Sequence, residues 1–140
     1  MDSVEALLGV PSGQGASPLA LARSVQRGLP VSALDRLARA VAPDDAGFKF
    51  QLVPKATLDR RRKASARTLT ADESDRLARI AKVWSFALDV FKQPERARAF
   101  LTRPHMMIEG ERPLDVALAS GLGADEVVNL LGRLLYGSAV

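Results

Sequence analysis

The chain has 140 residues, with 47% hydrophobic and 26% charged side chains and a formal net charge of +4, which is typical of one ordinary globular domain or two small ones. It contains no cysteine, which excludes disulfides, thiol nucleophiles and cysteine-ligated zinc or iron–sulfur sites. The N-terminus is acidic where a signal peptide is basic, and no apolar run approaches the roughly 18 residues of a membrane span, so we expect a cytoplasmic protein without a membrane partner.

The first third of the chain predicts a flexible arm followed by two short helices. Residues 1–16 contain the sequence PSGQG, and we expect them to form a mobile N-terminal arm. A short helix follows and stops at Gly28. Ser32 and Asp35 resemble a capping box ahead of a second helix, which Pro43 ends.

The next two helices are separated by a very short turn. Asp44 or Asp45 can cap a helix over residues 46–52, and Val53 and Pro54 then break the chain. Proline favours the first position of the following helix, because it has no amide proton to leave unpaired. Four short helices, the last two joined so tightly, predict a helix-turn-helix module.

The helix after this turn carries the excess positive charge of the sequence. Residues 55–67 include six Lys or Arg and one acid, whereas residues 1–54 carry five of each sign and residues 68–140 carry nine basic and ten acidic side chains. Such a run is either a solvated helix face or a surface that binds a polyanion. The turn has no glycine and the helix offers few Asn or Gln, so phosphate contact is better supported than base reading. The candidate DNA-binding residues are Lys55, Thr57, Arg60, Arg61, Arg62 and Lys63.

The second half of the chain begins with the longest predicted helix. Thr70 and Glu73 form a capping box, and apolar residues from Leu77 to Phe91 recur at three- and four-residue steps. This pattern predicts a helix over residues 71–91.

Shorter elements follow the long helix. Pro94 begins a helix, residues 105–112 form a loop or a short extended segment, and Pro113 begins one or two further turns that Gly121 and Gly123 close.

The final helix is apolar around most of its circumference. It follows Asp125 and Glu126, it ends at Gly137, and six of the nine residues 127–135 are Val or Leu. A helix of this kind is buried on more than one side. It is either a central core helix or a helix that packs on the domain with one side and on a partner with another. Tyr136 correspondingly either caps the core or contacts the partner.

The order of these signals resembles the MbcA/ParS/Xre antitoxin family over roughly residues 17–140. The basic helix is similar to the family's RTL-x-RR, and the long helix begins with its LT-x-x-ES-x-RL-x-R. A VF…A…(W/F)L…P stretch, a G-x-x-PLD turn and a C-terminal V-x-x-LL-x-R-x-x-YG follow. The matching residues are Lys55 to Arg61; Leu69, Thr70, Glu73, Ser74, Arg76, Leu77 and Arg79; Val90, Phe91, Ala97, Phe100, Leu101 and Pro104; Gly110, Pro113, Leu114 and Asp115; and Val127, Leu130, Leu131, Arg133, Tyr136 and Gly137.

The resemblance implies an all-α protein with an Xre-like helix-turn-helix region over residues 17–68 and a small helical toxin-binding domain over residues 69–140. Antitoxins of this family neutralise RES-domain toxins, which degrade NAD or transfer its ADP-ribose, and the C-terminal end of the antitoxin covers the NAD pocket. The toxin–antitoxin complex represses its own operon by binding promoter DNA. We also expect a homodimer, because helix-turn-helix modules usually act on DNA as symmetric dimers.

The resemblance places the toxin contacts at the C-terminal end of the chain. A pocket built for a dinucleotide needs hydrogen-bond donors and a flat or apolar group, which Arg133 and Tyr136 can supply. Arg133 has a second interpretation as a last-turn cation that complements the helix dipole. The predicted toxin-binding residues are Leu131, Arg133, Leu134, Tyr136, Gly137, Ser138, Ala139 and Val140.

An enzyme is the least supported class of protein. His105 is the only histidine, the sequence has no Gly-rich phosphate loop, and its acid pairs fall at predicted helix starts, where capping explains them. We therefore expect no catalytic residue, no metal and no cofactor. Two alternatives to an antitoxin remain: a stand-alone dimeric helix-turn-helix transcription regulator without a toxin partner, and a non-specific nucleic-acid-binding protein with a steep salt dependence.

Overall fold

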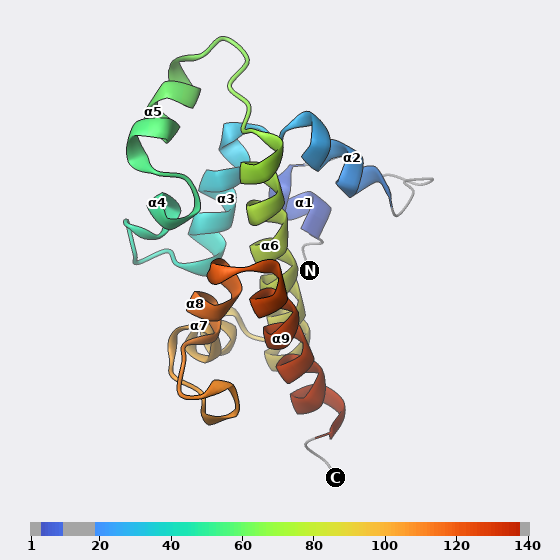
Figure 1. Ribbon diagram of the computed structural model, residues 1–140. Coiled ribbons are helices and arrows are strands. Elements are labelled where there is room, and N and C mark those ends of the chain that lie inside the picture. The colour runs from blue at the N-terminus through green and yellow to red at the C-terminus, as the bar shows by residue number, and fades with distance from the viewer. Residues whose placement is uncertain (1–3, 10–18, 138–140) are drawn as a thin grey trace. The chain divides into compact units, whose positions relative to one another are not determined.

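The computed structural model describes residues 4–9 and 19–137, and these residues form helices joined by short connections (Figure 1). Over these ranges the only extended pairing consists of two isolated antiparallel bridges. The predicted all-α class is therefore confirmed. None of the helices in the described part of the chain has the length and apolar character needed to cross a bilayer.

The chain divides into two compact units, Met1–Ala81 and Lys82–Val140, and the division falls inside helix α6. The first unit contains α1 (Val4–Leu8), α2 (Leu19–Arg27), α3 (Val31–Val41), α4 (Phe48–Leu52), α5 (Lys55–Lys63) and the beginning of α6 (Ala71–Phe91). The second unit contains the end of α6, α7 (Pro94–Thr102), the 3₁₀ helix η1 (Met106–Ile108), α8 (Pro113–Ala119), α9 (Gly121–Gly132) and the π-helix η2 (Arg133–Gly137).

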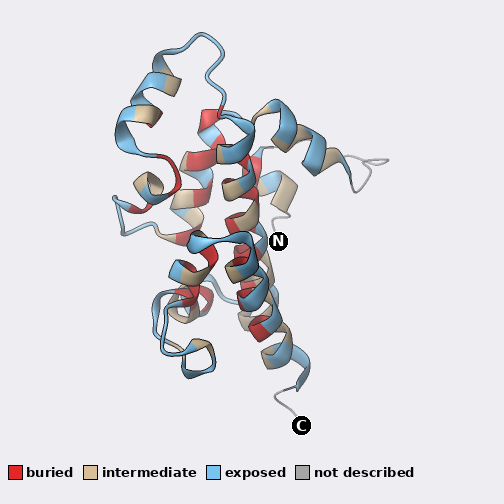
Figure 2. Ribbon diagram, in the orientation of Figure 1, coloured by how far each residue is buried: buried red, intermediate tan, exposed pale blue. Residues whose placement is uncertain are grey.

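Helix α3 contributes much of the core of the first unit. Its Leu34 and Leu37 are completely buried, as are Leu8 of α1, Phe48 of α4 and Leu58 of α5 (Figure 2). Each of these three helices contacts α3. Burying a side chain of this size stabilises a fold by about 1.5–3 kcal/mol. Helix α5 is thus attached to the core through one leucine, while its remaining side chains are polar or charged or lie at the surface.

The expected N-terminal arm is partly folded. Residues 4–8 form α1, and Leu8 is 0% exposed. This helix packs on α3, and Leu8 belongs to the core of the first unit. Residues 1–3 and 10–16 of the expected arm lie outside the described ranges.

The expected capping box at the start of α3 is wrong. The helix begins at Val31, directly after Pro30, and no side chain caps its N-terminus. Pro30 has the extended backbone that ends the preceding connection, so Ser32 already lies inside the first turn. The carboxylate of Asp35 instead accepts a hydrogen bond from Arg62 of α5.

The connection after α2 runs beside the segment that precedes α6. Gly28 stops α2, as predicted, with a φ of +97°, and a Cβ at this position would collide with the carbonyl oxygen of Leu69. The N–H of Leu69 donates to the carbonyl of Leu29 at 2.8 Å, and the N–H of Leu29 donates to the buried hydroxyl of Ser74 at 2.8 Å. These bonds tie the start of α3 to the start of α6.

The long helix α6 has the predicted bounds and the predicted capping box. The N–H of Glu73 donates to the hydroxyl of Thr70 at 3.1 Å, and the N–H of Thr70 donates to the carboxylate of Glu73 at 2.9 Å. The two bonds satisfy two of the backbone donors that the start of a helix leaves unpaired.

Helices α8 and α9 form a tight pair in the second unit. The hydroxyl of Ser120 accepts from the N–H of Gly123 at 2.9 Å, so α9 begins at Gly121 and the expectation that both glycines close the preceding helix is wrong. Gly123 lies so close to α8 that a Cβ would collide with the carbonyl oxygen of Val116. A serine cap and a close helix contact, not a helix stop, explain these residues.

Candidate functional site

The turn between α4 and α5 is stabilised by a buried side chain and by a hydrogen bond from α6. Val53 is completely buried, and Pro54, the residue before α5, has an extended backbone. The guanidinium of Arg76, on α6, donates to the carbonyl of Leu52 at 2.6 Å. Leu58 is buried one turn into α5. These contacts determine where the basic helix begins and which of its faces packs on the core.

Two arginines of this helix are engaged with acids of other helices. The Nε of Arg61 donates to one carboxylate oxygen of Glu73 at 3.1 Å, and its Nη2 donates to the other at 3.2 Å. The side chains are only 24% and 13% exposed, which protects the pair from solvent screening. Arg62 donates to Asp35 of α3 at 2.9 Å, with both side chains about one-third exposed or more.

The ion pair with Arg61 alters the acidity of Glu73. Partial burial by itself raises the pKa of a carboxyl group. Hydrogen bonds from Arg61 and from the backbone of Thr70, with the attraction of the Arg61 charge, outweigh this effect and hold the pKa of Glu73 below its ordinary value. Glu73 therefore stays ionised while it joins α5 to the start of α6.

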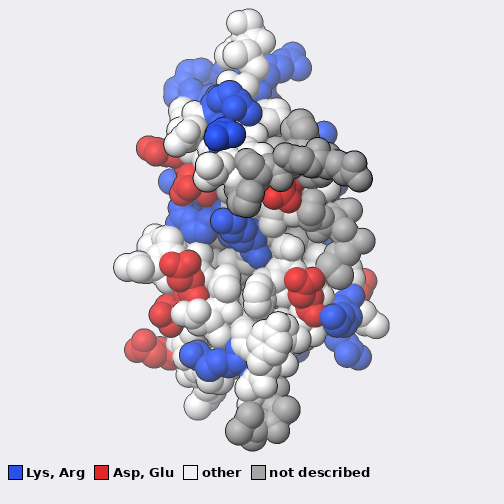
Figure 3. Space-filling model, turned by 90° about the vertical axis from the view of Figure 1, so that its right-hand side faces the viewer, with Lys and Arg blue, Asp and Glu red and all other residues white. Residues whose placement is uncertain are grey.

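The other predicted DNA-binding residues of α5 lie at the surface. Lys55, Arg60 and Lys63 are exposed and Thr57 is half-buried. Figure 3 draws the side of the molecule that carries α1 and α2, which is the right-hand side of Figure 1, and lysine and arginine side chains also gather near the top of this side. The ion pairs of Arg61 and Arg62 escaped sequence reasoning because their acidic partners are 12 and 27 residues away and follow no local pattern.

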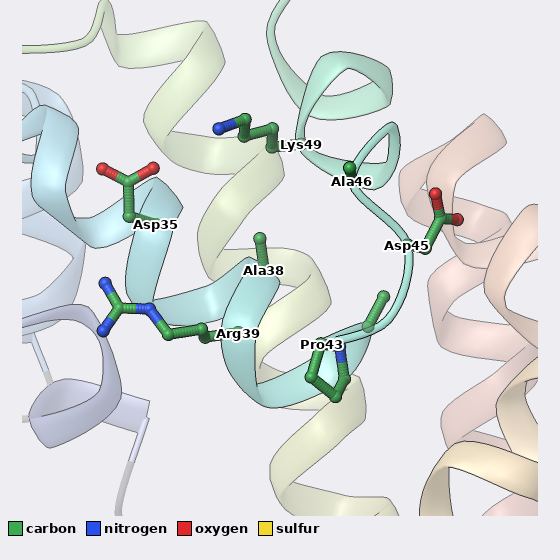
Figure 4. Close-up of a pocket in the computed structure, with 8 residues that line it drawn as sticks. Asp35, Ala38, Arg39, Pro43, Asp45, Ala46 and Lys49 are labelled. Atoms are coloured by element: carbon green, nitrogen blue, oxygen red, sulfur yellow. The ribbon is translucent and has the colours of Figure 1, made fainter.

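The hollow between α3 and α4 has a mixed charge. It encloses about 220 Å³ and is lined by Asp35 and Arg39 of α3, Lys49 of α4 and Asp45 of the connection between them (Figure 4). The carboxylate of Asp45 also accepts from the N–H of Gly47 at 3.0 Å. Because both signs of charge are present, this hollow does not extend the basic surface of α5.

The C-terminal end of the described chain combines buried and exposed residues. Leu131 is 0% exposed, so it belongs to the core of the second unit, and we leave it out of the proposed toxin contacts. Leu134 is half-buried, whereas Arg133 and Gly137 are exposed and the ring of Tyr136 is 76% exposed. The predicted residues Ser138, Ala139 and Val140 lie outside the described ranges.

The second unit exposes further apolar side chains that sequence reasoning missed. Met106 is 91% exposed and Met107 55% exposed on η1, and Leu122 is 79% exposed at the start of α9. A pair of methionines in a predicted loop was the signal that could have indicated an apolar surface.

A cavity of about 490 Å³ lies in the second unit. Its lining includes the rings of Phe91 and Phe100, whose centroids are 5.2 Å apart, and the imidazole of His105, 5.8 Å from Phe100. Leu134 of η2 also lines it.

The structure gives His105 a local structural role. Its Nδ1 accepts from the N–H of Met107 at 3.2 Å and so caps η1. Among the residues that the structure describes, no group of three or more His, Asp or Glu lies close enough together to hold a metal ion.

Comparison with known proteins identifies both halves of the chain. Residues 20–82 match the model of the antitoxin Xre-like helix-turn-helix domain, and residues 86–137 match that of the antitoxin Xre/MbcA/ParS C-terminal toxin-binding domain. A protein of Yersinia enterocolitica called Antitoxin Xre is 31% identical over 132 residues, which are 93% of this chain and 86% of the relative. Antitoxin Xre of Pseudomonas putida is 32% identical over 87 residues, which are 62% of this chain and 54% of that relative. The predicted order, a helix-turn-helix region and then a toxin-binding domain, is confirmed.

Proposed function

The chain belongs to the MbcA/ParS/Xre antitoxin family, and from this premise we propose that it neutralises a RES-domain toxin that acts on NAD and represses its own operon. The C-terminal end covers the toxin's NAD pocket, and the surface of α5 binds promoter DNA. Neither role requires chemistry by the antitoxin itself.

The exposure of Tyr136 carries the proposal for the toxin. An aromatic side chain that is 76% exposed at the end of a helix is an amphipathic group available to a partner. Arg133 is exposed in the same π-helix and offers hydrogen-bond donors, and Leu135 is 37% exposed. A chain end that inserts these groups into a dinucleotide pocket excludes NAD by occupying its place. Gly137 and residues 138–140 follow in the sequence and complete the proposed set of toxin contacts.

The division of labour within α5 supports the proposal for DNA. Lys55, Arg60 and Lys63 are exposed cations that can neutralise phosphates, while Arg61 and Arg62 join the helix to α6 and α3. The helix is therefore presented in a fixed orientation, which a helix in the major groove requires. A homodimer places two such helices on the two halves of a symmetric operator.

Co-expression with the product of the adjacent gene, which we expect to be a RES-domain toxin, tests the proposed function. We expect the two proteins to copurify, and NAD consumption by the toxin to stop when the antitoxin is present. Loss of NAD at an unchanged rate in the presence of excess antitoxin contradicts the proposal, and so does the absence of a complex.

A further inference from the structure

The cavity in the second unit has the form of a docking site for apolar side chains. It is open to solvent, and its volume of about 490 Å³ lies within the range of ligand pockets, roughly 300–1,000 Å³. Phe91 and Phe100 supply aromatic surface, and Ala99, Pro104 and Leu134 supply aliphatic surface. The contacts among the rings of Phe91, Phe100 and His105 hold this surface in shape without a ligand.

The two arginines that line this cavity carry the same positive charge. The lining contains Arg96, which lies in α7, and Arg103, which directly follows α7, and it contains no acidic residue. Both arginines are exposed, and within the described ranges neither forms an ion pair. An apolar cavity beside two available guanidinium groups fits an apolar side chain that has a carboxylate next to it.

The position of the cavity in the chain identifies its occupant. All its lining residues, from 91 to 134, fall within residues 86–137, the stretch that matches the toxin-binding domain. Leu134, on its wall, belongs to the same π-helix as Tyr136. We propose that this cavity receives an apolar side chain flanked by Asp or Glu on the surface of the toxin. It is a second anchor beside the exposed ring of Tyr136, and it rests on the proposed function.

A second copy of the chain is a poorer occupant. In a two-fold symmetric contact the same patch faces itself, so Arg96 and Arg103 would face Arg96 and Arg103 of the other copy. Like charges in an interface are unfavourable by several kcal/mol in general. A toxin segment with a carboxylate reverses the sign of this interaction.

Two kinds of variant of the full chain test the anchor. Ala99→Trp fills the cavity, with Ala119→Trp on an exposed position of α8 as its control. Arg96→Glu reverses one charge at the rim, with the exposed Lys82→Glu as a control that changes the net charge equally. Circular dichroism and the melting temperature establish that each variant is folded. The Kd for the purified RES-domain toxin is measured by calorimetry, and sedimentation gives the oligomeric state.

We expect Ala99→Trp and Arg96→Glu each to weaken toxin binding by about tenfold or more, as loss of an interface anchor does, while both controls bind like the unmodified chain. The effect of Arg96→Glu should shrink as salt is raised, and that of Ala99→Trp should not. Since Arg96 is exposed, its variant remains informative if Ala99→Trp does not fold.

The outcomes separate this inference from the proposed function. If the unmodified chain binds and inhibits the toxin but both cavity variants bind equally well, the anchor is wrong and the proposed function stands. A change in sedimentation with an unchanged toxin Kd assigns the cavity to a second copy and overturns the inference. If the unmodified chain itself does not bind the toxin, the proposed function fails first.

Discussion

Glu73 combines two structural tasks in one carboxylate. It caps α6 through Thr70 and pairs with Arg61 of α5 in a bidentate geometry. Hydrogen bonds to charged groups contribute about 1.5–3 kcal/mol each, and most of this depends on the ionised form. The orientation of the basic helix is therefore coupled to the protonation of one residue on another helix.

Replacing Glu73 with Gln should lower the free energy of unfolding at pH 7 by about 2 kcal/mol, because the charge-assisted bonds to Arg61 are lost. The folded-state pKa of Glu73 is below its ordinary value of 4.5, so its contribution is present above that pH and is lost as the pH falls through the folded-state pKa. Urea unfolding at several pH values should show the gap between the two proteins closing in acid.

Asp72→Asn is the matched control for this substitution. Asp72 is exposed in the same first turn of α6, where it shares the favourable helix dipole. We expect a change of a few tenths of a kcal/mol. Equal losses for the two variants would mean that the pairing with Arg61 adds nothing beyond the dipole.

Replacing the exposed cations of α5 should weaken DNA binding without affecting the stability of the fold. We expect Lys55→Ala, Arg60→Ala and Lys63→Ala together to weaken promoter binding and to reduce the slope of log affinity against log salt by about 0.9 for each phosphate that the protein no longer neutralises. Fluorescence anisotropy with promoter DNA at several salt concentrations measures both quantities. Thermal stability should hardly change, because all three side chains are exposed.

Arg61→Ala provides the contrast to this triple variant. Its main expected effect is a lower melting temperature, because the carboxylate of Glu73 loses its partner while it is only 13% exposed. A triple variant that binds DNA with an unchanged salt slope would remove α5 from the DNA interface.

At the scale of the elements, helix bounds could be predicted where the residues that set them lie within a few positions of one another in the sequence. The bounds of α6 could be predicted because Thr70 and Glu73 form their capping box within one turn and the apolar spacing continues to Phe91. The start of α9 could not, since glycine usually ends helices, whereas Ser120 caps this one and Gly123 is required by its neighbour.

The candidate site follows the same rule. The basic run and the aromatic residue near the end of the chain are visible in the sequence. The burial of Leu131 and the pairing of Arg62 with Asp35 depend on tertiary contacts that no spacing encodes. The aromatic cavity joins Phe91 to Leu134, which are separated by most of the second unit's sequence.

The contact between α8 and α9 gives a prediction for a pair of glycines. Gly123→Ala should destabilise the protein by about 1–3 kcal/mol, because its methyl group has no room beside the carbonyl of Val116. Gly121→Ala, two residues earlier in the same helix, meets nothing within 4 Å and should be neutral or slightly stabilising. The midpoint of urea unfolding measures both, and equal midpoints would show that the helices can separate without cost.

At the scale of the whole molecule, the proposed roles fall into different units. The cations of α5 belong to the first unit, and both the exposed end at Tyr136 and the aromatic cavity belong to the second. Each unit has a buried core of its own. Changes at one functional surface should therefore leave the other intact.

Deleting residues 136–140 tests this separation. We expect the truncated antitoxin to lose inhibition of the toxin, because the proposed function places Tyr136 and the residues after it in the NAD pocket, while promoter binding is preserved. NAD consumption and DNA anisotropy, measured on the same preparation, give the two readouts. Leu19→Ala, at an exposed apolar position of the first unit, serves as the control for loss of a surface side chain. Full inhibition by the truncated protein would show that the end is dispensable.

The methionines of η1 also determine how the protein responds to oxidants. The sequence has no cysteine and three methionines, so its sulfur chemistry belongs to thioethers alone. Met106 and Met107 are 91% and 55% exposed, and peroxide converts such side chains to polar sulfoxides. Because neither residue is in the core, oxidation changes the character of this surface before it affects the fold, and sulfoxide reductases can restore it.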